Sequence, residues 1–248
     1  DRYLIVRADE DRAWQLVRQG TVEGKKILWV SNTVNRTMDR MRKALKDKLP
    51  ATTFHSRFRY MDRVSRQREL VDNFSSGDNA MVAFTTQVAE MSLDLSADLL
   101  ISDAAPIPAM IQRLGRLNRF AEKPDKIRTA LIIQPENPLP YNDQDLLLAD
   151  EWLRKVSGEI PKSQRDLAAA FIEITSKIDE DISNVSCAWL DIPERSEEDK
   201  NALVDPGYTV EMVREEDLQA GPLDEMVIPM PIPHRQNWAS WNRKKRFL

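Results

Sequence analysis

The sequence predicts an α/β protein in which helices flank a parallel sheet. Short apolar segments alternate with amphipathic segments over the first 135 residues, and this alternation is typical of parallel strands joined by helices. The segment Ile27–Val30 is apolar at every position, as expected for a strand buried on both faces. Prolines break the alternation after about residue 135, so we expect a smaller, mostly helical or irregular region to follow.

The expected strands are the short apolar runs of the first region. Each holds three to five residues rich in β-branched, aromatic or large aliphatic side chains, which strands favour. In chain order they are Tyr3–Arg7, Ile27–Val30, Thr52–Phe54, Met81–Phe84, Leu99–Ile101 and Ala130–Ile133. In a parallel sheet of this kind, functional residues gather at the carboxyl ends of the strands.

The expected helices follow these strands. Val34–Leu49 repeats apolar residues, Met38 and Met41 among them, at three- and four-residue spacing, which predicts a helix. Pro108 lies near the first turn of Ile107–Asn118, where proline is well tolerated. The other expected helices are Asp11–Arg18, Tyr60–Phe74, 143–157 and 164–178, the last capped by Ser163.

We expect two domains. Pro135, Pro138 and Pro140 mark the change of pattern, so residues 1–140 are expected to form the sheet domain. Residues 141–248 are expected to form a helical linker and an accessory region, with loops, short strands and an extended tail beyond about residue 185.

Seven glycines, one cysteine and two histidines exclude several kinds of site. A phosphate-binding P-loop needs two glycines five residues apart before Lys-Ser or Lys-Thr. The nearest match, Gly20–Lys26, is one residue short and precedes a strand instead of following one. Cys187 alone provides no disulfide and no cysteine-based zinc site. Neither histidine precedes an aspartate, so we expect no metal site and no nuclease activity in this chain.

We also expect neither a membrane-spanning segment nor a signal peptide. No apolar run approaches the roughly 18–20 residues that a membrane helix needs, and Asp1–Val6 does not resemble a signal peptide. We therefore expect a cytoplasmic location and no membrane partner. Because the chain does not begin with methionine, we expect it to be part of a longer chain or a processed product.

Charge is unevenly distributed although the net charge is only -4. Residues 34–68 hold eleven Lys and Arg against three Asp, whereas residues 141–225 hold eight against 22 Asp and Glu. A basic region within an acidic chain is compatible with a nucleic-acid-binding face. The alternative is a solvated amphipathic helix over residues 34–48.

The most informative segment is Gln112–Arg119, in which Arg113, Arg116 and Arg119 recur every three residues. On a continuous helix this spacing places all three within about 120° of arc. Like charges repel at that spacing, so an anion such as phosphate is the natural partner. An exposed basic helix face is the alternative.

A second segment, Phe84–Leu95, continues directly from the expected strand Met81–Phe84. Its hydroxyl and amide side chains are suited to a phosphate backbone, and Glu90 and Asp94 to a ribose or a basic partner. The alternative is helix capping with structural ion pairs.

Together these segments resemble motifs V and VI of superfamily 2 helicases. Asp103–Pro106, Phe54–Phe58 with Asp62-Arg63, and Ile27–Thr33 as a motif IV region are most similar to the helicase–nuclease family of type I CRISPR interference. The resemblance is strongest over residues 25–135. It implies a second RecA-like lobe, whereas the P-loop and acidic box of that family belong to a first lobe that this sequence lacks.

The resemblance implies roles for individual residues at an ATP site between two lobes. Arg119 is the expected arginine finger and Arg116 a second contact to the γ-phosphate, while Gln112 positions water or phosphate. Asp94 is expected to hold the ribose of ATP or to couple to DNA. Arg113 is expected to pair with an acid such as Glu90. Magnesium ligands are expected on the missing lobe.

The resemblance also implies contacts with single-stranded DNA. The candidates are Asn32, Thr33, Ser56, Arg57, Thr86 and Gln87. His55 is expected to be a structural hydrogen-bonding residue. Trp238 and Trp241, beside the basic residues 243–246, are further candidates for contact with DNA or a partner.

The expected function is therefore the C-terminal half of an ATP-dependent single-strand-DNA translocase of CRISPR interference, inactive without its first lobe. Its expected partners are that lobe, single-stranded DNA and the CRISPR surveillance complex. Two alternatives remain open at this point, namely a non-catalytic helicase-like scaffold and part of a DEAH-type RNA helicase.

Overall fold

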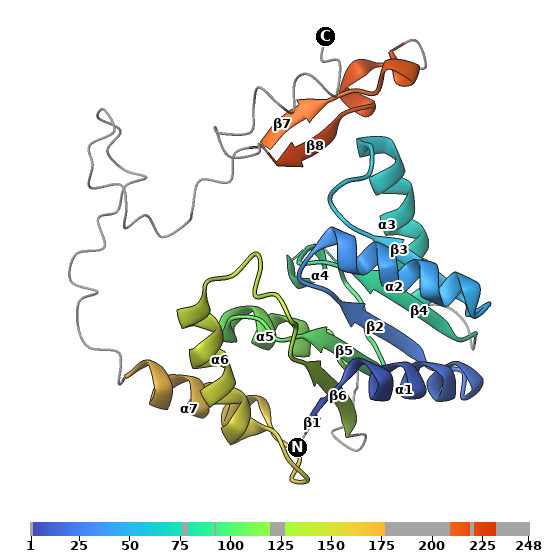
Figure 1. The fold of residues 1–248 in the computed structure, drawn as a ribbon. Helices are drawn as coiled ribbons and strands as arrows, with labels where there is room; N and C mark the ends of the chain where they lie inside the picture. The colour runs from blue at the N-terminus through green and yellow to red at the C-terminus, as the bar shows by residue number, and fades with distance from the viewer. Residues whose placement is uncertain are drawn as a thin grey trace, which may run out of the picture. The chain divides into compact units, whose positions relative to one another are not determined.

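The computed structural model describes residues 2–75, 79–91, 93–119, 127–176, 209–218 and 221–231. The chain forms two compact units, residues 1–176 and residues 177–248, and each is described here by itself. The first unit confirms the predicted α/β class, because helices cover both faces of a parallel sheet (Figure 1).

The sheet of the first unit has six strands in the order β1-β6-β5-β2-β4-β3. Every neighbouring pair is parallel. All six strands lie within a few residues of their predicted positions, at Tyr3–Ala8 (β1), Lys26–Val30 (β2), Ala51–Phe54 (β3), Met81–Thr85 (β4), Leu99–Asp103 (β5) and Arg128–Ile133 (β6).

Seven helices belong to this unit as far as it is described. They are Glu10–Val22 (α1), Val34–Lys46 (α2), Tyr60–Ser75 (α3), Val88–Met91 (α4), Ile107–Leu114 (α5), Asp143–Val156 (α6) and Gln164–Thr175 (α7). The first two pack on one face of the sheet, and α3 to α7 contribute to the core on the other.

Alternating strand side chains produce these two cores. In β2, Leu28 and Val30 enter the core on the α5 side, whereas Ile27 and Trp29 enter the core beside α1. The alternation follows from the two-residue period of a strand, and all four side chains are 0% exposed.

Side-chain caps fix where several helices begin. The carboxylate of Asp9 accepts a hydrogen bond from the backbone of Arg12 at the start of α1. Ser163 forms a capping box with Asp166 at the start of α7, as its sequence position predicts. Such caps satisfy backbone N–H groups that lack a partner within the helix.

The helix that carries the arginine repeat is shorter than predicted. It ends at Leu114 with Gly115 as its C-cap, and Leu117 forms an isolated parallel bridge with Ala97. Asn118 has a φ of 54°, in the left-handed region that a helix interior does not use. The expectation that the three arginines share one helix face is therefore wrong.

The first unit extends beyond the domain boundary expected near residue 140. Trp152, Leu153 and Val156 of α6 and Leu167 and Ile174 of α7 are each no more than 1% exposed in the core. The loop between these helices also covers the outer edge of β1, where Lys162 exchanges backbone hydrogen bonds with Tyr3.

The second unit contains an antiparallel strand pair in the part that is described. Its strands are β7, Thr209–Met212, and β8, Ile228–Pro231, and the 3₁₀ turns η3 (Glu215–Asp217) and η4 (Leu223–Glu225) lie between them. Cys187, Trp238, Trp241 and residues 243–246 lie outside the described residues. Within the described part, no helix has the length and hydropathy that a membrane crossing requires.

Candidate functional site

The strand order brings the predicted DNA-contact residues to one edge of the sheet. Asn32 and Thr33 follow β2, Ser56 and Arg57 follow β3, and Thr86 and Gln87 follow β4. Because β4 lies between β2 and β3, the carboxyl ends of the three strands are consecutive. We call this row of residues the carboxyl-edge group.

Exposure differs among the members of the carboxyl-edge group. Arg57 is exposed, and Ser56, Thr33 and Gln87 are half-buried, so each of these can meet a ligand. Thr33 also caps α2, since its hydroxyl accepts a hydrogen bond from the backbone of Arg36. The side chain of Thr86 is almost fully buried.

Asn32 is buried and connects several segments of the fold. Its side-chain amide donates to the carbonyl of Ala104 at 2.8 Å and accepts from Arg113 at 3.1 Å. Its backbone N–H donates to Asp103, and its carbonyl accepts from the Gln87 amide. The Asn32 side chain is therefore engaged inside the protein, and direct contact with DNA would require these bonds to open.

Arg113 is fully buried and pairs with Glu90, as predicted. Their shortest nitrogen–oxygen distance is 2.8 Å. The guanidinium also donates to the Ser102 hydroxyl, the Asp103 carbonyl and the Tyr141 hydroxyl at 2.9–3.1 Å. A buried guanidinium is tolerated only when its donors find partners, and here they join α5 to β5 and to the segment before α6.

A second buried ion pair lies beside this one. The guanidinium of Arg40 donates to Asp103 at 2.8 Å and to Glu10 at 2.9 Å, and it lies 4.8 Å from the centre of a Trp29 ring. Burial alone would raise the pKa of Glu10, but the hydrogen bond and charge of Arg40 hold that pKa below its ordinary value. The ion pairs of Arg40 thus stabilise the buried side of the carboxyl-edge group, since Asp103 also accepts a hydrogen bond from the backbone of Asn32.

Arg119 lies near the amino ends of the parallel strands, away from the carboxyl-edge group. The backbone of its neighbour Asn118 donates to the carbonyl of Ala97, just before β5 begins. The Arg119 side chain is 40% exposed and forms an ion pair with Asp94, which is 63% exposed, at 2.9 Å. The structure thus brings together two residues to which the family resemblance gives a role at ATP, away from the carboxyl-edge group.

Arg116 is placed differently from Arg119. Its guanidinium donates to the carbonyl oxygens of Ala89, at 2.9 Å, and of Glu90 in α4, and the residue is only 9% exposed. A γ-phosphate contact by Arg116 stays a prediction, and it requires these two bonds to open. Gln112 is exposed on α5, so its predicted role also stays untested.

His55 is buried in the loop after β3, as expected for a structural residue. Its Nδ1 accepts a hydrogen bond from the backbone of Arg57 at 3.2 Å, and its ring stacks on Phe58 with centres 4.2 Å apart. Burial, with the nearby charges of Arg57 and Arg66, lowers the pKa of His55 to about 4. The imidazole is therefore neutral at physiological pH.

Two residues of this region were not found by sequence reasoning. Tyr141 accepts from Arg113 at 3.1 Å and from Gln87 at 3.4 Å, and burial raises the pKa of its phenol. Arg40 looked like one more cation of a basic helix. The position of Arg40 one turn beyond Arg36 on α2 did not predict that it is buried, because only the fold places Asp103 beside it.

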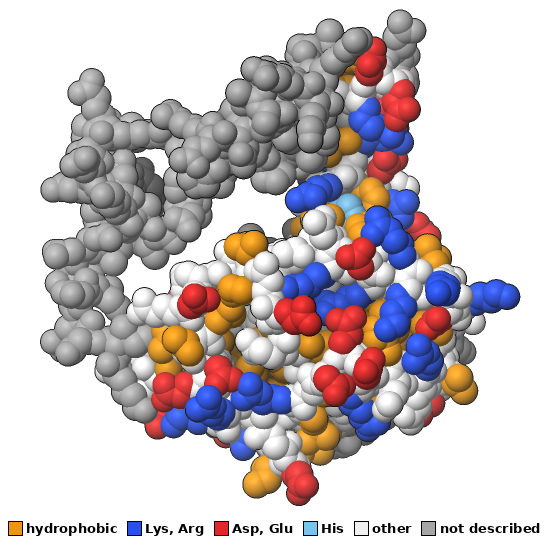
Figure 2. Space-filling model, viewed as in Figure 1, with side chains coloured by type: hydrophobic (Ala, Val, Ile, Leu, Met, Phe, Trp, Pro, Cys, Tyr) orange, Lys and Arg blue, Asp and Glu red, His pale blue; other side chains and the backbone are white. Residues whose placement is uncertain are grey.

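A cleft of about 520 Å³ opens at the carboxyl ends of β1 and β6. Arg36, Arg40 and Lys43 of α2 form one wall, and Glu10 and Glu136 lie among the facing residues. Figure 2 shows Lys and Arg side chains gathered along α2, with acidic side chains among them. None of the predicted site residues lines this cleft. Among the described residues, no cluster of His, Cys, Asp and Glu is suited to hold a metal ion.

Comparison with known proteins agrees with the motif pattern. A family model described as "CRISPR-associated nuclease/helicase Cas3, C-terminal" matches residues 23–122. Residues 23–122 are thus similar to the C-terminal region of Cas3 proteins. This match covers β2 to α5 and thus both groups of predicted site residues, and it confirms the resemblance inferred from the motifs.

Relatives of this Cas3-like domain are large proteins. A putative CRISPR-associated nuclease/helicase Cas3 of Myxococcus xanthus is 47% identical over 167 residues, which are 66% of this chain and 22% of that protein. A second, from Methanocaldococcus jannaschii, is 37% identical over 121 residues, or 46% of this chain and 16% of that protein. The chain therefore spans less than a quarter of the length of these relatives.

Solved structures share the fold. The crystal structure of T. fusca Cas3-ADP matches 74% of this chain and 25% of its own with a TM-score of 0.59 and 23% identity. A chain of a CRISPR RNA-guided surveillance complex, pre-nicking, matches 76% of this chain and 26% of its own, with a TM-score of 0.58 and 24% identity. At this identity the likeness concerns the fold.

Proposed function

We propose that this chain is the second RecA-like lobe of an ATP-dependent single-strand-DNA translocase that acts in CRISPR interference. The Cas3-like match over residues 23–122 supports the family. The separation of the Asp94–Arg119 pair from the carboxyl-edge group supports the division of labour, because a translocase needs one surface for ATP and another for the strand.

The exposed guanidinium of Arg119 is the observation that carries the proposal. Its ion pair with Asp94 is largely solvated, and such pairs contribute at most about 1 kcal/mol. The guanidinium can therefore leave Asp94 at little cost when a nucleotide arrives on the first lobe. There it stabilises negative charge on the phosphoryl group as the bond to the leaving group breaks. Asp94 is then free for the ribose of the nucleotide.

The carboxyl-edge group supplies the contacts with DNA in this proposal. The guanidinium of Arg57 donates hydrogen bonds to a phosphate, and the hydroxyls of Ser56 and Thr33 donate to neighbouring sugar-phosphate atoms. The Gln87 amide donates to the Asn32 carbonyl and to Tyr141, so it reaches the DNA only when one of these bonds opens. Backbone contacts of this kind carry no sequence information, which suits a protein that moves along any strand. Asn32 and Thr86 are proposed to support this edge from within the fold.

Replacement of Arg119 tests the ATP role. In the enzyme assembled from this chain and its first lobe, Arg119→Ala should lower the kcat of DNA-stimulated ATP hydrolysis by about a thousand-fold, the usual contribution of an arginine finger. Nucleotide affinity should change little, since the first lobe holds most of the ATP. The matched control is Arg154→Ala, which removes another solvent-exposed arginine paired with an aspartate. Unchanged turnover in Arg119→Ala would reject this residue as the finger.

Two further measurements separate this proposal from its alternatives. We infer that the chain alone does not hydrolyse ATP, because its sequence contains no P-loop, and that it has no nuclease site. A DNA-gripping lobe should lose affinity for single strands steeply as salt rises, whereas absence of binding at low salt would favour a scaffold. Competition between DNA and RNA oligomers separates a DNA translocase from an RNA helicase.

A further inference from the structure

The start of α3 carries an aromatic and basic surface that the proposed function does not use. Tyr60 is 50% exposed and Met61 is 41% exposed. The Arg63 guanidinium lies 5.4 Å from the centre of the Tyr60 ring, and that of Arg66 lies 4.5 Å from the centre of the Phe58 ring. We call these five residues the α3 surface.

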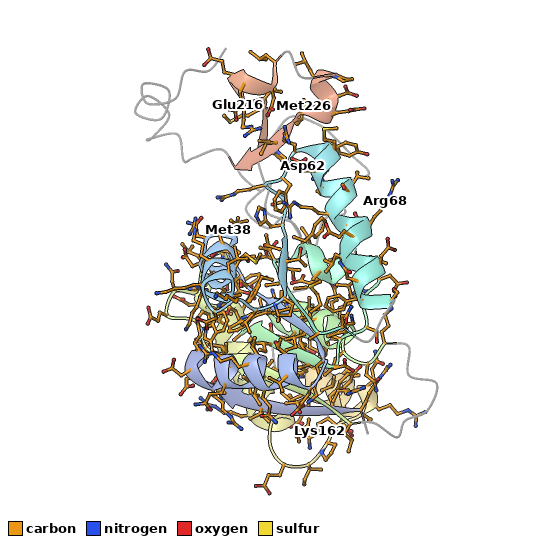
Figure 3. All side chains as sticks on the ribbon, turned by 90° about the vertical axis from the view of Figure 1, so that its right-hand side faces the viewer. Met38, Asp62, Arg68, Lys162, Glu216 and Met226 are labelled. Atoms are coloured by element: carbon orange, nitrogen blue, oxygen red, sulfur yellow. The ribbon has the colours of Figure 1, made fainter. Side chains whose placement is uncertain are left out.

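The α3 surface continues the carboxyl-edge group. It begins in the loop after β3, directly beyond Arg57, and β3 is the neighbour of β4 in the sheet. Figure 3 shows Met38 of α2 and Asp62 of α3 toward one end of the first unit, and Lys162 toward the other. A single strand of DNA that contacts the carboxyl ends of β2, β4 and β3 in turn therefore reaches the α3 surface next.

The α3 surface is both positively charged and fixed in place. No described residue forms an ion pair with Arg57, Arg63 or Arg66, in contrast to Arg59, which pairs with Asp62. Phe58 is held by its stacking on the buried His55 ring. Burial is the main cause of the low pKa of the His55 imidazole, and the charges of Arg57 and Arg66 lower that pKa further. The surface is thus suited to an anion that also carries flat apolar groups.

We propose that the α3 surface binds single-stranded nucleic acid, with Tyr60 stacking on a base and Arg63 and Arg66 holding adjacent phosphates. Bases stack on aromatic side chains with little dependence on sequence, and a guanidinium beside the ring adds attraction for the phosphate. The inference rests on the proposed function and extends it, because the carboxyl-edge group contacts only the backbone whereas Tyr60 contacts a base.

Strands with and without bases test this inference. Binding of fluorescent oligothymidine to this chain is compared with binding of an abasic oligonucleotide of equal length. Tyr60→Ala should weaken binding of oligothymidine about ten-fold, the effect of one lost stack, and leave the abasic strand unaffected. Tyr60→Phe should retain wild-type affinity. Arg63→Ala should weaken both strands and reduce the salt slope by about 0.7, as for one phosphate contact on a single strand.

Two variants make the outcomes distinguishable. Leu147→Ala is the control, since Leu147 is a 71% exposed apolar side chain on α6, and it should bind like wild type. Arg57→Ala tests the carboxyl-edge group and should weaken both strands. Unchanged oligothymidine binding by Tyr60→Ala, together with weaker binding by Arg57→Ala, overturns the α3 surface and leaves the proposed function standing.

Other results reject the inference in different ways. If the wild-type chain binds neither oligonucleotide at low salt, DNA binding by the α3 surface and by the carboxyl-edge group are both rejected. Equal weakening of both strands by Tyr60→Ala, with unchanged thermal unfolding, overturns stacking as the role of Tyr60. Displacement of oligothymidine by polyglutamate at equal charge, with no effect of Tyr60→Ala, would assign the surface to an acidic protein and overturn the proposal.

Discussion

At the scale of single residues, three arginines with the same spacing have three different environments. Arg113 is fully buried in a network of hydrogen bonds, Arg116 donates to two carbonyl groups of α4, and Arg119 is exposed beside Asp94. The repeat correctly indicated a need for partners. It did not indicate that Arg113 and Arg116 find their partners in the interior, because the end of α5 at Leu114 turns the later residues away from the helix face.

Arg113 should be one of the most sensitive positions for stability. Arg113→Met leaves Glu90 and the polar groups around it buried without their partner, which typically costs about 3–5 kcal/mol. The free energy of unfolding is measured by urea denaturation. Arg42→Ala is the control because Arg42 and Asp39 form an exposed pair, so the expected change is below about 1 kcal/mol. A loss below 1 kcal/mol in Arg113→Met would show that the network tolerates the missing charge.

His55 should make stability depend on pH. Its pKa is lowered to about 4 in the folded chain and is about 6.5 in the unfolded chain. Protons therefore bind the unfolded chain more strongly, and stability is lost as pH falls from about 6.5 towards 4. Protonation would also put an N–H at Nδ1 against the backbone N–H of Arg57.

The measurement is urea unfolding at pH 7 and pH 5 for wild type and for His55→Gln. The wild-type chain should lose about 2 kcal/mol more than the variant, since each unit of pKa difference corresponds to about 1.4 kcal/mol. Carboxylates contribute equally to both proteins, so only the difference reports on His55. Equal losses in the two proteins would show that this imidazole does not remain neutral on folding.

At the scale of elements, the apolar periodicity was sufficient for most of the first unit. Strands such as Ile27–Val30 and helices such as Val34–Leu49 are visible because burial on one or two faces dictates where apolar residues recur. The four-residue helix α4, Val88–Met91, is too short to show a period. The early end of α5 was also not predicted, because the left-handed Asn118 acts through backbone conformation and not through hydrophobicity.

Helices α6 and α7 should be indispensable for folding of the first unit. Trp152, Leu153 and Leu167 are essentially inaccessible to solvent, and each such side chain contributes roughly 1.5–3 kcal/mol through burial. Their combined loss approaches the whole stability of a typical domain. A fragment of residues 1–176 should therefore unfold in one cooperative transition, and a fragment of residues 1–140 should show none. Circular dichroism during thermal unfolding measures this difference, and a cooperative transition in 1–140 would contradict it.

At the scale of the whole molecule, the sheet order decides which residues form a site. The sequence predicts that Asn32, Ser56 and Thr86 each follow a strand, but it does not contain the order β2-β4-β3 that makes them neighbours. Resemblance to a helicase family supplied the grouping that spacing alone could not. The same limit applies to Asn32 and Tyr141, which contact Arg113 although they lie 81 and 28 residues from it in the sequence.

The covered edge of β1 also has a consequence for how copies of this protein behave together. An open strand edge is a template on which a second chain can form a strand, and intermolecular sheets grow in this way. Here the carbonyl of Ile5 accepts from Gly158, and Tyr3 exchanges bonds with Lys162, so the backbone groups that would recruit another strand at these positions are already occupied. The loop between α6 and α7 thus guards the first unit against aggregation through β1.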